Sequence, residues 1–398
     1  MFRIHAAWRF SICLMAVLIL LLILPFERKV DAHAYSAGYT TLSLTKSNIE
    51  MTYTLDELSV IELIGGDVNK NGMLEQEEFT AVKDQLLAMI KKNVIVQINN
   101  EVQDWTQLES IVLDRKGDAT KVILKASFPP VSASQPISLS DNLYMNDAAT
   151  NYVDLLTINY GKQKSTAALS GKNRVWAMQL TESDYGGLQQ DMKSPQNNGS
   201  GQAEGPKNEA SSSSEGISGW YSFFTLGINH ILSGYDHLLF LFSLLIARQK
   251  FKQYAAMITA FTIAHSITLT LTVLGIIDVS PRIVEPAIAL SICFVAVDNI
   301  VRKEVSYRWV LTFVFGLIHG MGFADILKEM DLPRSQLATD LISFNLGIET
   351  VQVTLVAILL PLLGLLHRWR YSRHAVTAGS TLALLLGGIW LAQRLFFN

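Results

Sequence analysis

Cysteine is almost absent from this sequence. The 398 residues include two cysteines, Cys13 and Cys293, and each lies in a separate apolar run. Two cysteines placed in this way can build neither a disulfide framework nor a thiolate metal site. Any metal that the protein binds must therefore be held by nitrogen and oxygen ligands.

Positive charge is also in short supply, which argues against a nucleic-acid partner. The formal net charge is −3, and residues 35–217 contain 15 Lys/Arg against 23 Asp/Glu, a balance of −8. An acidic domain repels phosphates, so we expect no binding to nucleic acid. The sequence also lacks a glycine-rich nucleotide-binding loop. A process driven by ATP would therefore need a separate ATPase subunit.

The C-terminal part has few charges of either sign. Its 181 residues, 218–398, include 13 Lys/Arg and 10 Asp/Glu, far below the roughly 25% charged residues of globular domains. This composition excludes a soluble enzyme that folds as one globular unit. Six apolar stretches in this part each approach the ~20 residues that cross a bilayer. They lie at about 219–247, 254–277, 283–301, 308–328, 338–366 and 374–396.

The loops between these stretches predict their orientation. Nine of the 13 basic residues fall in one set of alternate loops, which the positive-inside rule assigns to the cytoplasm. They are Arg248, Lys250, Lys252, Arg302, Lys303, Arg308, Arg368, Arg370 and Arg373. We therefore expect a multi-pass protein of the plasma membrane, in contact with the lipid bilayer, whose N-terminal domain and C-terminus both lie outside the cell.

The N-terminus has the pattern of a secretory signal. Two arginines precede an apolar run over about residues 10–25, and the triplet Ala32-His33-Ala34 has the small-x-small form that a signal peptidase accepts. We predict that residues 1–34 are a signal peptide. An uncleaved membrane anchor is the alternative, because two basic residues follow the apolar run.

Residues 35–187 are expected to form an exported, mainly β domain that resembles a small sandwich. Short runs of alternating polar and apolar residues are separated by turn residues, as in half-buried strands. The runs lie at 41–44, 49–53, 94–98, 121–128 and 153–159. Residues 188–217, rich in Ser, Gly, Asn, Gln and Pro, predict a flexible linker to the membrane domain at 218–398. Capture of metal and docking of a partner are both open roles for the exported domain.

One insertion interrupts the β pattern of this domain. Residues 67–78 fit the calcium loop of an EF-hand along their full length, and helices are expected on either side, over 55–64 and 79–92. The expected oxygen ligands come from Asp67, Asn69, Asn71, the Met73 carbonyl and Glu78, with Gly72 at the turn. Two of these ligands are neutral Asn, so we expect weak calcium binding, in the range of about 10⁻⁴–10⁻³ M. A solvated acidic loop is the alternative.

Ionisable residues inside the apolar stretches are functional candidates, because each costs a few kcal/mol to insert in a membrane. His230 and His237 are seven residues apart, two helical turns, so both imidazoles are expected on one face. Asp236 lies about 100° round an ideal helix from His237. Asp236 therefore either turns inward where Gly234 loosens the helix, or it orients a histidine from outside the ligand set.

Two further histidines lie in other stretches. His265 is in the second stretch, and His319 is in the fourth. Gly316 and Gly320 form a small-xxx-small face that would bring His319 to a close helix crossing. The sixth stretch has no ionisable residue between positions 375 and 391, and we interpret it as structural.

Other polar residues complete the candidate set. Asn345, Glu349 and Gln352 form one stripe on the fifth stretch, and Glu349 is the leading candidate for a buried, titrating carboxylate. Ser266 lies in a stripe of hydroxyl residues, and such stripes often serve only to hold neighbouring helices together. Glu285 lies near the expected outer surface, where it would attract cations.

The chemistry of this set favours a transition metal. Imidazoles with carboxylates suit nickel, cobalt, zinc or iron rather than magnesium or copper(I). A carrier must also release its ion, which neutral histidines and a titratable acid allow. The predicted metal ligands are His230, Asp236, His237, His265, His319, Asn345 and Glu349, with Ser266, Glu285 and Gln352 as accessory polar residues.

Five short sequence motifs lie between about Phe224 and Leu366. They read HILSGYDHLLF, FTIAHSITL, VEPAIALS, FGLIHGMGFA and FNLGIE. Together they resemble the HupE/UreJ family of membrane proteins, whose members are regarded as nickel or cobalt permeases. The resemblance implies that His230, Asp236 and His237 form the family's His-and-Asp-His motif. This chain departs from the shorter permeases in having Ile231 where they usually have proline, and in its large exported domain.

The prediction is a membrane permease for a divalent transition metal, nickel or cobalt, rather than an enzyme. An intramembrane zinc-dependent hydrolase is the alternative, with three histidines on zinc, Asp236 or Glu349 as base and Ser266 assisting. A membrane assembly or sensory protein without transport activity is the third class.

Overall fold

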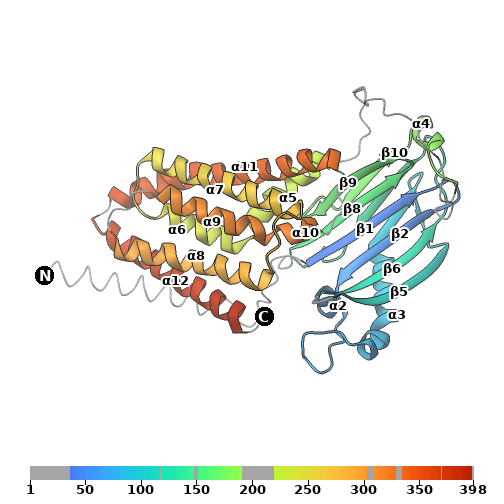
Figure 1. Ribbon diagram of the computed structural model, residues 1–398, viewed down its shortest axis with the longest axis horizontal. Helices are drawn as coiled ribbons and strands as arrows, with labels where there is room; N and C mark the ends of the chain where they lie inside the picture. The colour runs from blue at the N-terminus through green and yellow to red at the C-terminus, as the bar shows by residue number, and fades with distance from the viewer. Residues whose placement is uncertain are drawn as a thin grey trace. The chain divides into compact units, whose positions relative to one another are not determined.

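The computed structural model describes residues 36–116, 119–147, 151–190, 219–302, 308–328, 334–368 and 370–396. These residues form a β-rich N-terminal region and a helical C-terminal region (Figure 1). The predicted signal peptide at 1–34 and all but the first three residues of the predicted linker lie outside the described residues.

One layer of the N-terminal region is a six-stranded sheet. Its strand order is β5-β6-β2-β1-β8-β9, in which β1 and β8 run parallel and all other neighbours are antiparallel. The strands are β1 (Ser36–Leu44), β2 (Ile49–Asp56), β5 (Gln107–Lys116), β6 (Ala119–Phe128), β8 (Tyr152–Tyr160) and β9 (Gln163–Ser170). Every second residue of β2 is buried, as its alternating sequence predicts.

A second, four-stranded sheet packs against the first. Its order is β10-β7-β3-β4, and its strands are β3 (Val94–Ile98), β4 (Glu101–Gln103), β7 (Pro136–Asp141) and β10 (Val175–Gln179). One apolar core joins the two sheets, with Leu42 and Leu124 from the first sheet and Val96 and Leu139 from the second. Each of the five predicted strand runs lies within an observed strand, so the β-rich part of the prediction is confirmed.

A polar network is buried in this region. The hydroxyls of Tyr53 and Tyr152 both donate to Oδ2 of Asp141, over 2.9 and 2.6 Å. Thr40 donates to the carboxylate of Asp154 over 2.8 Å. Burial raises the pKa of the Asp154 carboxyl well above its ordinary value, and the nearby Asp141 charge raises it further.

The described part of this region also contains three helices, two between β2 and β3 and one after β10. They are α2 (Glu57–Ile64), α3 (Gln76–Asn93) and α4 (Glu182–Gly186). Asp56 is the N-cap of α2, and its side chain accepts the N–H of Ser59. The segment between α2 and α3 contains the predicted calcium loop, and the helices on either side of it agree with the sequence pattern.

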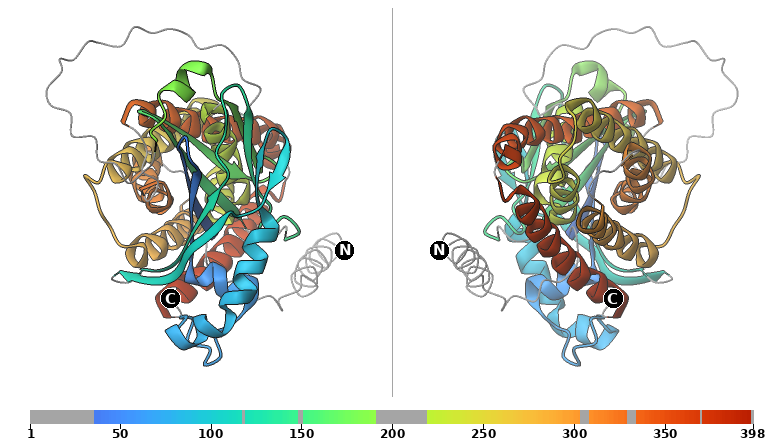
Figure 2. Two further views of the ribbon diagram at one scale, coloured as in Figure 1. Left: turned by 90° about the vertical axis from the view of Figure 1, so that its right-hand side faces the viewer. Right: turned by 90° about the vertical axis from the view of Figure 1, so that its left-hand side faces the viewer.

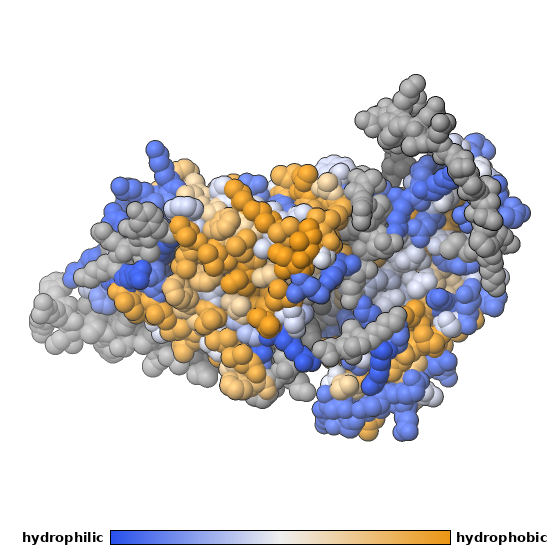
Figure 3. Space-filling model, viewed as in Figure 1, coloured by the Kyte–Doolittle hydropathy of each residue, from blue (hydrophilic) through white to orange (hydrophobic). Residues whose placement is uncertain are grey.

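The C-terminal region is built from helices whose apolar sides form its surface. The helices are α5 (Gly219–Ser233), α6 (Tyr235–Leu245), α7 (Phe251–Val273), α8 (Pro281–Val301), α9 (Arg308–Gly322), α10 (Ala324–Lys328), α11 (Arg334–Arg368) and α12 (Ser372–Phe396). They pack side by side, most extensively as α7 with α9, α5 with α11 and α8 with α12 (Figures 1 and 2). Hydrophobic residues cover most of the visible face of this region (Figure 3).

Four of these helices, α7, α8, α11 and α12, are long and apolar enough to cross a membrane. The sequence predicted six membrane-spanning stretches. Its first stretch is divided at Gly234 into α5 and α6, of 15 and 11 residues, and its fourth is the 15-residue α9 followed by α10. At 1.5 Å per residue, a 15-residue helix is only about 22 Å long. The region is therefore an apolar helical bundle with four candidate membrane spans.

Two glycines on α9 allow α9 and α7 to approach closely. A Cβ atom at Gly316 would lie 2.7 Å from the carbonyl oxygen of Phe261, and one at Gly320 would collide with the backbone of His265. The predicted small-xxx-small face is therefore a real helix contact. It brings the backbone beside His319 directly against the turn of α7 that carries His265.

Candidate metal centre

The first two histidines of the centre lie on either side of a break in the chain. Gly234 ends α5 and precedes α6, and its N–H donates to the carbonyl oxygen of His230 over 3.0 Å. A Cβ atom at Gly234 would lie 2.9 Å from Nδ1 of His237, so only glycine leaves room for this imidazole. The break brings the rings of His230 and His237 to a centroid separation of 4.7 Å.

Asp236 orients His237 from the side. Its Oδ1 lies 2.9 Å from Nδ1 of His237 and also accepts the backbone N–H of His237 over 2.8 Å. Because a carboxylate accepts, Nδ1 carries the proton and Nε2 presents its lone pair to the interior. Of the two roles predicted for Asp236, the geometry matches the orienting one.

The other two histidines come from the α7–α9 contact. His265 and His319 are both fully buried. Nδ1 of His319 donates to the carbonyl oxygen of Phe315 over 2.9 Å, which leaves Nε2 as its lone-pair nitrogen. The His319 and His265 rings lie 5.1 and 6.2 Å from the ring of His237. Four imidazoles from α5, α6, α7 and α9 therefore converge.

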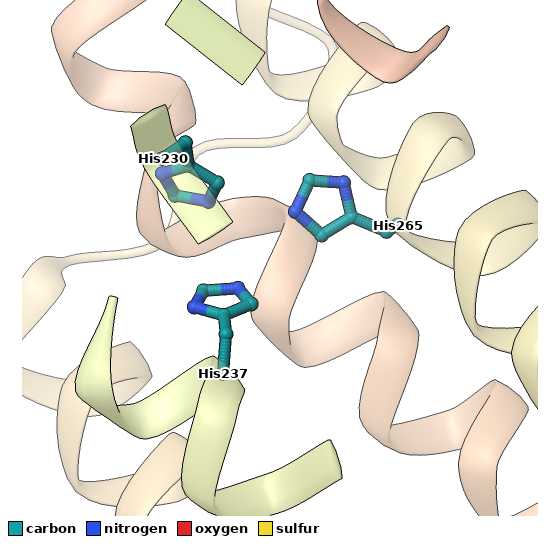
Figure 4. A group of neighbouring side chains, drawn as sticks. All are labelled: His230, His237 and His265. Atoms are coloured by element: carbon teal, nitrogen blue, oxygen red, sulfur yellow. The ribbon is translucent and has the colours of Figure 1, made fainter. Parts of the chain in front are cut away.

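Three of these imidazoles lie close enough together that they could hold one metal ion. One nitrogen from each of His230, His237 and His265 lies within 4.8 Å of the other two (Figure 4). Two nitrogen ligands at 2.0–2.1 Å from one ion are at most about 4.2 Å apart. Small rotations of the rings would thus complete a coordination sphere. His319, beside His237, could supply a fourth nitrogen.

Aromatic side chains enclose the four imidazoles. The rings of Phe323 and Phe344 lie 4.4 and 5.5 Å from that of His230, and those of Phe240 and Phe261 lie 4.8 and 5.3 Å from that of His319. Such apolar surroundings lower the local dielectric. An ion in the centre would then depend on the imidazoles for its ligands.

Arg394 of α12 is part of the site, although the sequence did not predict it. Its side chain is 9% exposed, with Nη2 3.8 Å from Oδ2 of Asp236 and Nε 3.6 Å from Oε2 of Glu285. The interpretation of the sixth stretch as structural did not include this contact, because Arg394 lies beyond positions 375–391. The signal was present in the sequence, because Arg394 is the one charged residue after position 374.

The three polar residues predicted to form one stripe on α11 lie in different environments. Glu349 is exposed on the surface of the helix, so the expectation of a buried carboxylate at this position is wrong. Asn345 is half-buried and lies beside His265, while its amide nitrogen donates to the carbonyl oxygen of Leu341 over 2.8 Å. Gln352 is buried and accepts a hydrogen bond from Thr262 over 2.9 Å.

The two remaining accessory residues serve other contacts. The hydroxyl of Ser266 donates to the carbonyl oxygen of Thr262, one turn earlier in the same helix, over 2.7 Å. This is the local bond typical of hydroxyl residues in membrane helices. Glu285 is half-buried and lies beside Arg394 rather than beside the histidines. Neither side chain adds to the imidazole cluster.

A small cavity borders the centre on one side. Its volume is about 20 Å³, and its lining includes His237, Phe261, Met257, Leu244 and Gln352. A cavity of about 10–15 Å³ can hold one water molecule. The space beside His237 is therefore of the size of a single water or ion, and it extends toward the α6–α7 turn.

The loop between α2 and α3 is closed by its own polar side chains. The carboxylate of Asp67 accepts the N–H groups of Asn71 and Gly72, over 3.1 and 2.9 Å. Oε1 of Glu78 accepts the N–H of Val68 over 2.9 Å, which brings the last predicted ligand back to the start of the loop. The sharp turn occurs at Gly72, whose φ is +76°.

The apolar helices and the buried histidine cluster define an α-helical membrane protein with an internal polar site. The model of the family described as HupE / UreJ protein matches residues 207–394. This part of the chain belongs to the HupE/UreJ family, as its motifs predicted. No curated protein matches the chain.

Proposed function

We propose that the helical region is a permease for a divalent transition metal, with nickel or cobalt as its cargo. The observation that carries this proposal is the convergence of four buried imidazoles from four helices in one apolar bundle. Membership of the HupE/UreJ family is consistent with metal transport. Ligand chemistry supports a transition metal as cargo, since imidazole favours nickel, cobalt, zinc or iron over hard cations, and the choice of nickel or cobalt rests on the family.

A permease must be able both to bind its ion and to release it. The ligand nitrogens are separated by up to 4.8 Å, wider than the about 4.2 Å maximum of a filled site. Binding would draw the imidazoles together and release would let them relax. The small cavity beside His237 supports entry or exit of one ion on the side of the α6–α7 turn.

The positions of the two candidate bases disfavour the alternative, a zinc-dependent hydrolase. Such an enzyme needs a carboxylate or similar base beside the metal-bound water. Asp236 is already engaged by His237 and Arg394, and Glu349 is exposed. Ser266 donates to its own helix backbone. No described carboxylate is therefore left as a base beside the three histidines.

The proposal includes a topology. We infer that α5 with α6, and α9 with α10, act as the first and fourth of six crossings, each divided or shortened where it carries a histidine. Non-helical backbone at membrane depth is acceptable where it is buried in protein. The basic loops on one side support a plasma-membrane protein with its N-terminal domain and C-terminus outside the cell.

The test is uptake of nickel, cobalt and zinc into proteoliposomes, reported by a metal-sensitive dye. We expect saturable flux with the native chain and its loss in His237→Ala. His374→Ala is the matched control, because His374 is exposed on α12, far along the chain from the cluster, and its loss should leave flux unchanged.

The outcomes separate the three functional classes. Flux that His237→Ala abolishes and His374→Ala preserves supports a permease. Folded protein that shows no flux, retains one zinc through dialysis and hydrolyses a lipid or peptide would establish the enzyme instead. Folded protein with neither flux nor bound metal would leave an assembly or sensory role.

We also propose that the loop at 67–78 binds calcium weakly and stabilises the α2–α3 segment. The support is the closure of the loop by Asp67 and Glu78, which lie at the first and last ligand positions of the pattern. Calcium should raise Tm of the full chain at millimolar concentrations, and Glu78→Gln should remove the effect. Equal response of the native and variant proteins would contradict this assignment.

A further inference from the structure

A basic cavity lies at one end of the helical bundle, where α6, α8 and α11 end and α9 and α12 begin. Its volume is about 170 Å³, and its lining includes Arg248, Arg302, Arg308, Arg373, His367 and Ser372. None of the described lining residues is acidic. Since about 10–15 Å³ suffices for one water, the cavity has room for a ligand of several atoms.

Arg308 is the buried arginine of this cavity. Its side chain is 3% exposed, and Nη2 lies 3.1 Å from Oδ2 of Asp298 and also bonds to the side-chain oxygen of Asn299. Its Nε and Nη1 have no hydrogen-bond partner among the residues that the structure describes. Buried donors without partners are energetically unfavourable. An acceptor in the cavity would satisfy them.

The charges around the cavity are unbalanced. Asp298 pairs with both Arg308 and Arg302, the second over 3.3 Å. It is the only described carboxylate with an ion pair to these four arginines, so among the described residues four positive charges face one negative charge. Arg373 donates to the carbonyl oxygens of Asn299 and Ile300, over 3.1 and 2.7 Å, which fixes it at the cavity without neutralising it.

Two neutral features of the lining also suit an anion. Helix α12 begins at Ser372, so the positive end of its dipole and its first N–H groups lie at the cavity. The amide of Gln249 lines the same space, and both its polar atoms lack a partner in the described part of the chain. Donors therefore approach the cavity from several helices.

We propose that this cavity binds a phosphate group, from either a phospholipid headgroup or a small phosphate compound. Guanidinium groups bind phosphate in a bidentate, charge-assisted manner, and a phosphate has enough acceptor oxygens for donors on several sides. The loops that contain the cavity are those expected on the cytoplasmic side, at the level of anionic lipid headgroups. The site is separate from the imidazole cluster and does not depend on metal transport.

The test measures anion binding by four full-length proteins in a neutral detergent. They are the native chain, Arg308→Gln, Arg248→Gln and Arg282→Gln. The last is the matched control, since Arg282 is an exposed arginine at the opposite end of α8. Native mass spectrometry counts retained phosphatidylglycerol and phosphatidylcholine, and calorimetric titration measures inorganic phosphate.

We expect one tightly retained anion on the native chain and on Arg282→Gln. Its affinity should fall about tenfold in Arg248→Gln and further in Arg308→Gln, the size of effect expected for lost charge-assisted hydrogen bonds. Preferential retention of phosphatidylglycerol would identify a lipid headgroup, and binding of inorganic phosphate alone would identify a soluble source. If Arg308→Gln does not fold, the anion affinity of Arg248→Gln compared with that of the native chain decides the test. Equal binding by all four proteins, or none by the native chain, overturns the proposal.

Discussion

His237 and Asp236, neighbours in sequence, are joined by a hydrogen bond of 2.9 Å between Nδ1 and Oδ1. The bond sets the tautomer of His237 and directs Nε2 toward the other imidazoles. Arg394 lies 3.8 Å from the second oxygen of the same carboxylate. A chain of three residues, Arg394–Asp236–His237, therefore runs from α12 to the proposed metal site. This arrangement matches the carboxylate–histidine pairs that orient ligands in known metal sites.

The first prediction concerns this carboxylate. Asp236→Asn should weaken nickel binding by about 10–100-fold, because the His237 imidazole loses the charge that makes it a better ligand. Competition with a metal-indicator dye in detergent measures the affinity. Glu349→Gln is the control and should bind nickel as the native chain does, since Glu349 is exposed. A larger effect from Glu349→Gln than from Asp236→Asn would contradict this arrangement of the site.

The second prediction concerns Arg394. Arg394→Met should weaken nickel binding less than Asp236→Asn does, because it acts only through the position of the carboxylate. In the Asp236→Asn background, the same change should add little, since coupled residues are not additive. The double-mutant cycle measures this coupling with the same dye. Full additivity would show that Arg394 acts independently of Asp236.

The third prediction tests the contact between α7 and α9. Gly316→Ala places a methyl group 2.7 Å from the carbonyl oxygen of Phe261, so it should lower stability by about 1–3 kcal/mol. Gly388→Ala is the matched change, since no atom lies within 4 Å of its added Cβ. It should be neutral or stabilising, because alanine favours the helix by up to about 1 kcal/mol. Thermal unfolding in detergent compares the two variants. An equal Tm for both would contradict the close contact between α7 and α9.

The fourth prediction is a pH dependence of the β-rich region. Burial raises the pKa of Asp154 in the folded chain, so the folded form keeps its proton where the unfolded form, with a pKa near 3.9, has lost it. The contribution of Asp154 to stability is therefore greatest at acidic pH and decreases as the pH rises above about 4.

Asp154→Asn should remove this decrease, because its amide oxygen can still accept from Thr40 but carries no proton equilibrium. The measurement is Tm of the full chain from pH 4 to pH 8, with Asp84→Asn, an exposed residue of α3, as the control. An unchanged pH dependence in Asp154→Asn would show that folding does not raise the pKa of this carboxyl.

Several elements followed directly from local sequence patterns. The alternation of residues 49–53 and 153–159 predicted β2 and β8, and the helices around the loop at 67–78 agreed with the EF-hand pattern. The four membrane histidines were recognisable because a charged or polar side chain is unfavourable in an apolar helix. Gly316 and Gly320 predicted a close crossing, which the structure contains.

The errors came from tertiary packing, which spacing alone does not determine. Glu349 shares a stripe with Asn345 and Gln352, but the rotation of α11 against α5 and α7 leaves Glu349 exposed. Arg394 lies 158 residues after Asp236 and reaches it only through the fold. The break at Gly234 was expected only as a local loosening, yet it divides the stretch into two helices.

The most direct test of the central claim is the coordination of the bound metal. X-ray absorption spectroscopy of the nickel-loaded full chain should show at least three imidazole nitrogens at about 2.1 Å. His265→Ala should reduce that number by one, and His374→Ala should leave the spectrum unchanged. A nickel environment of oxygen ligands alone, or one unaffected by His265→Ala, would contradict the assignment of the buried histidines as the metal site.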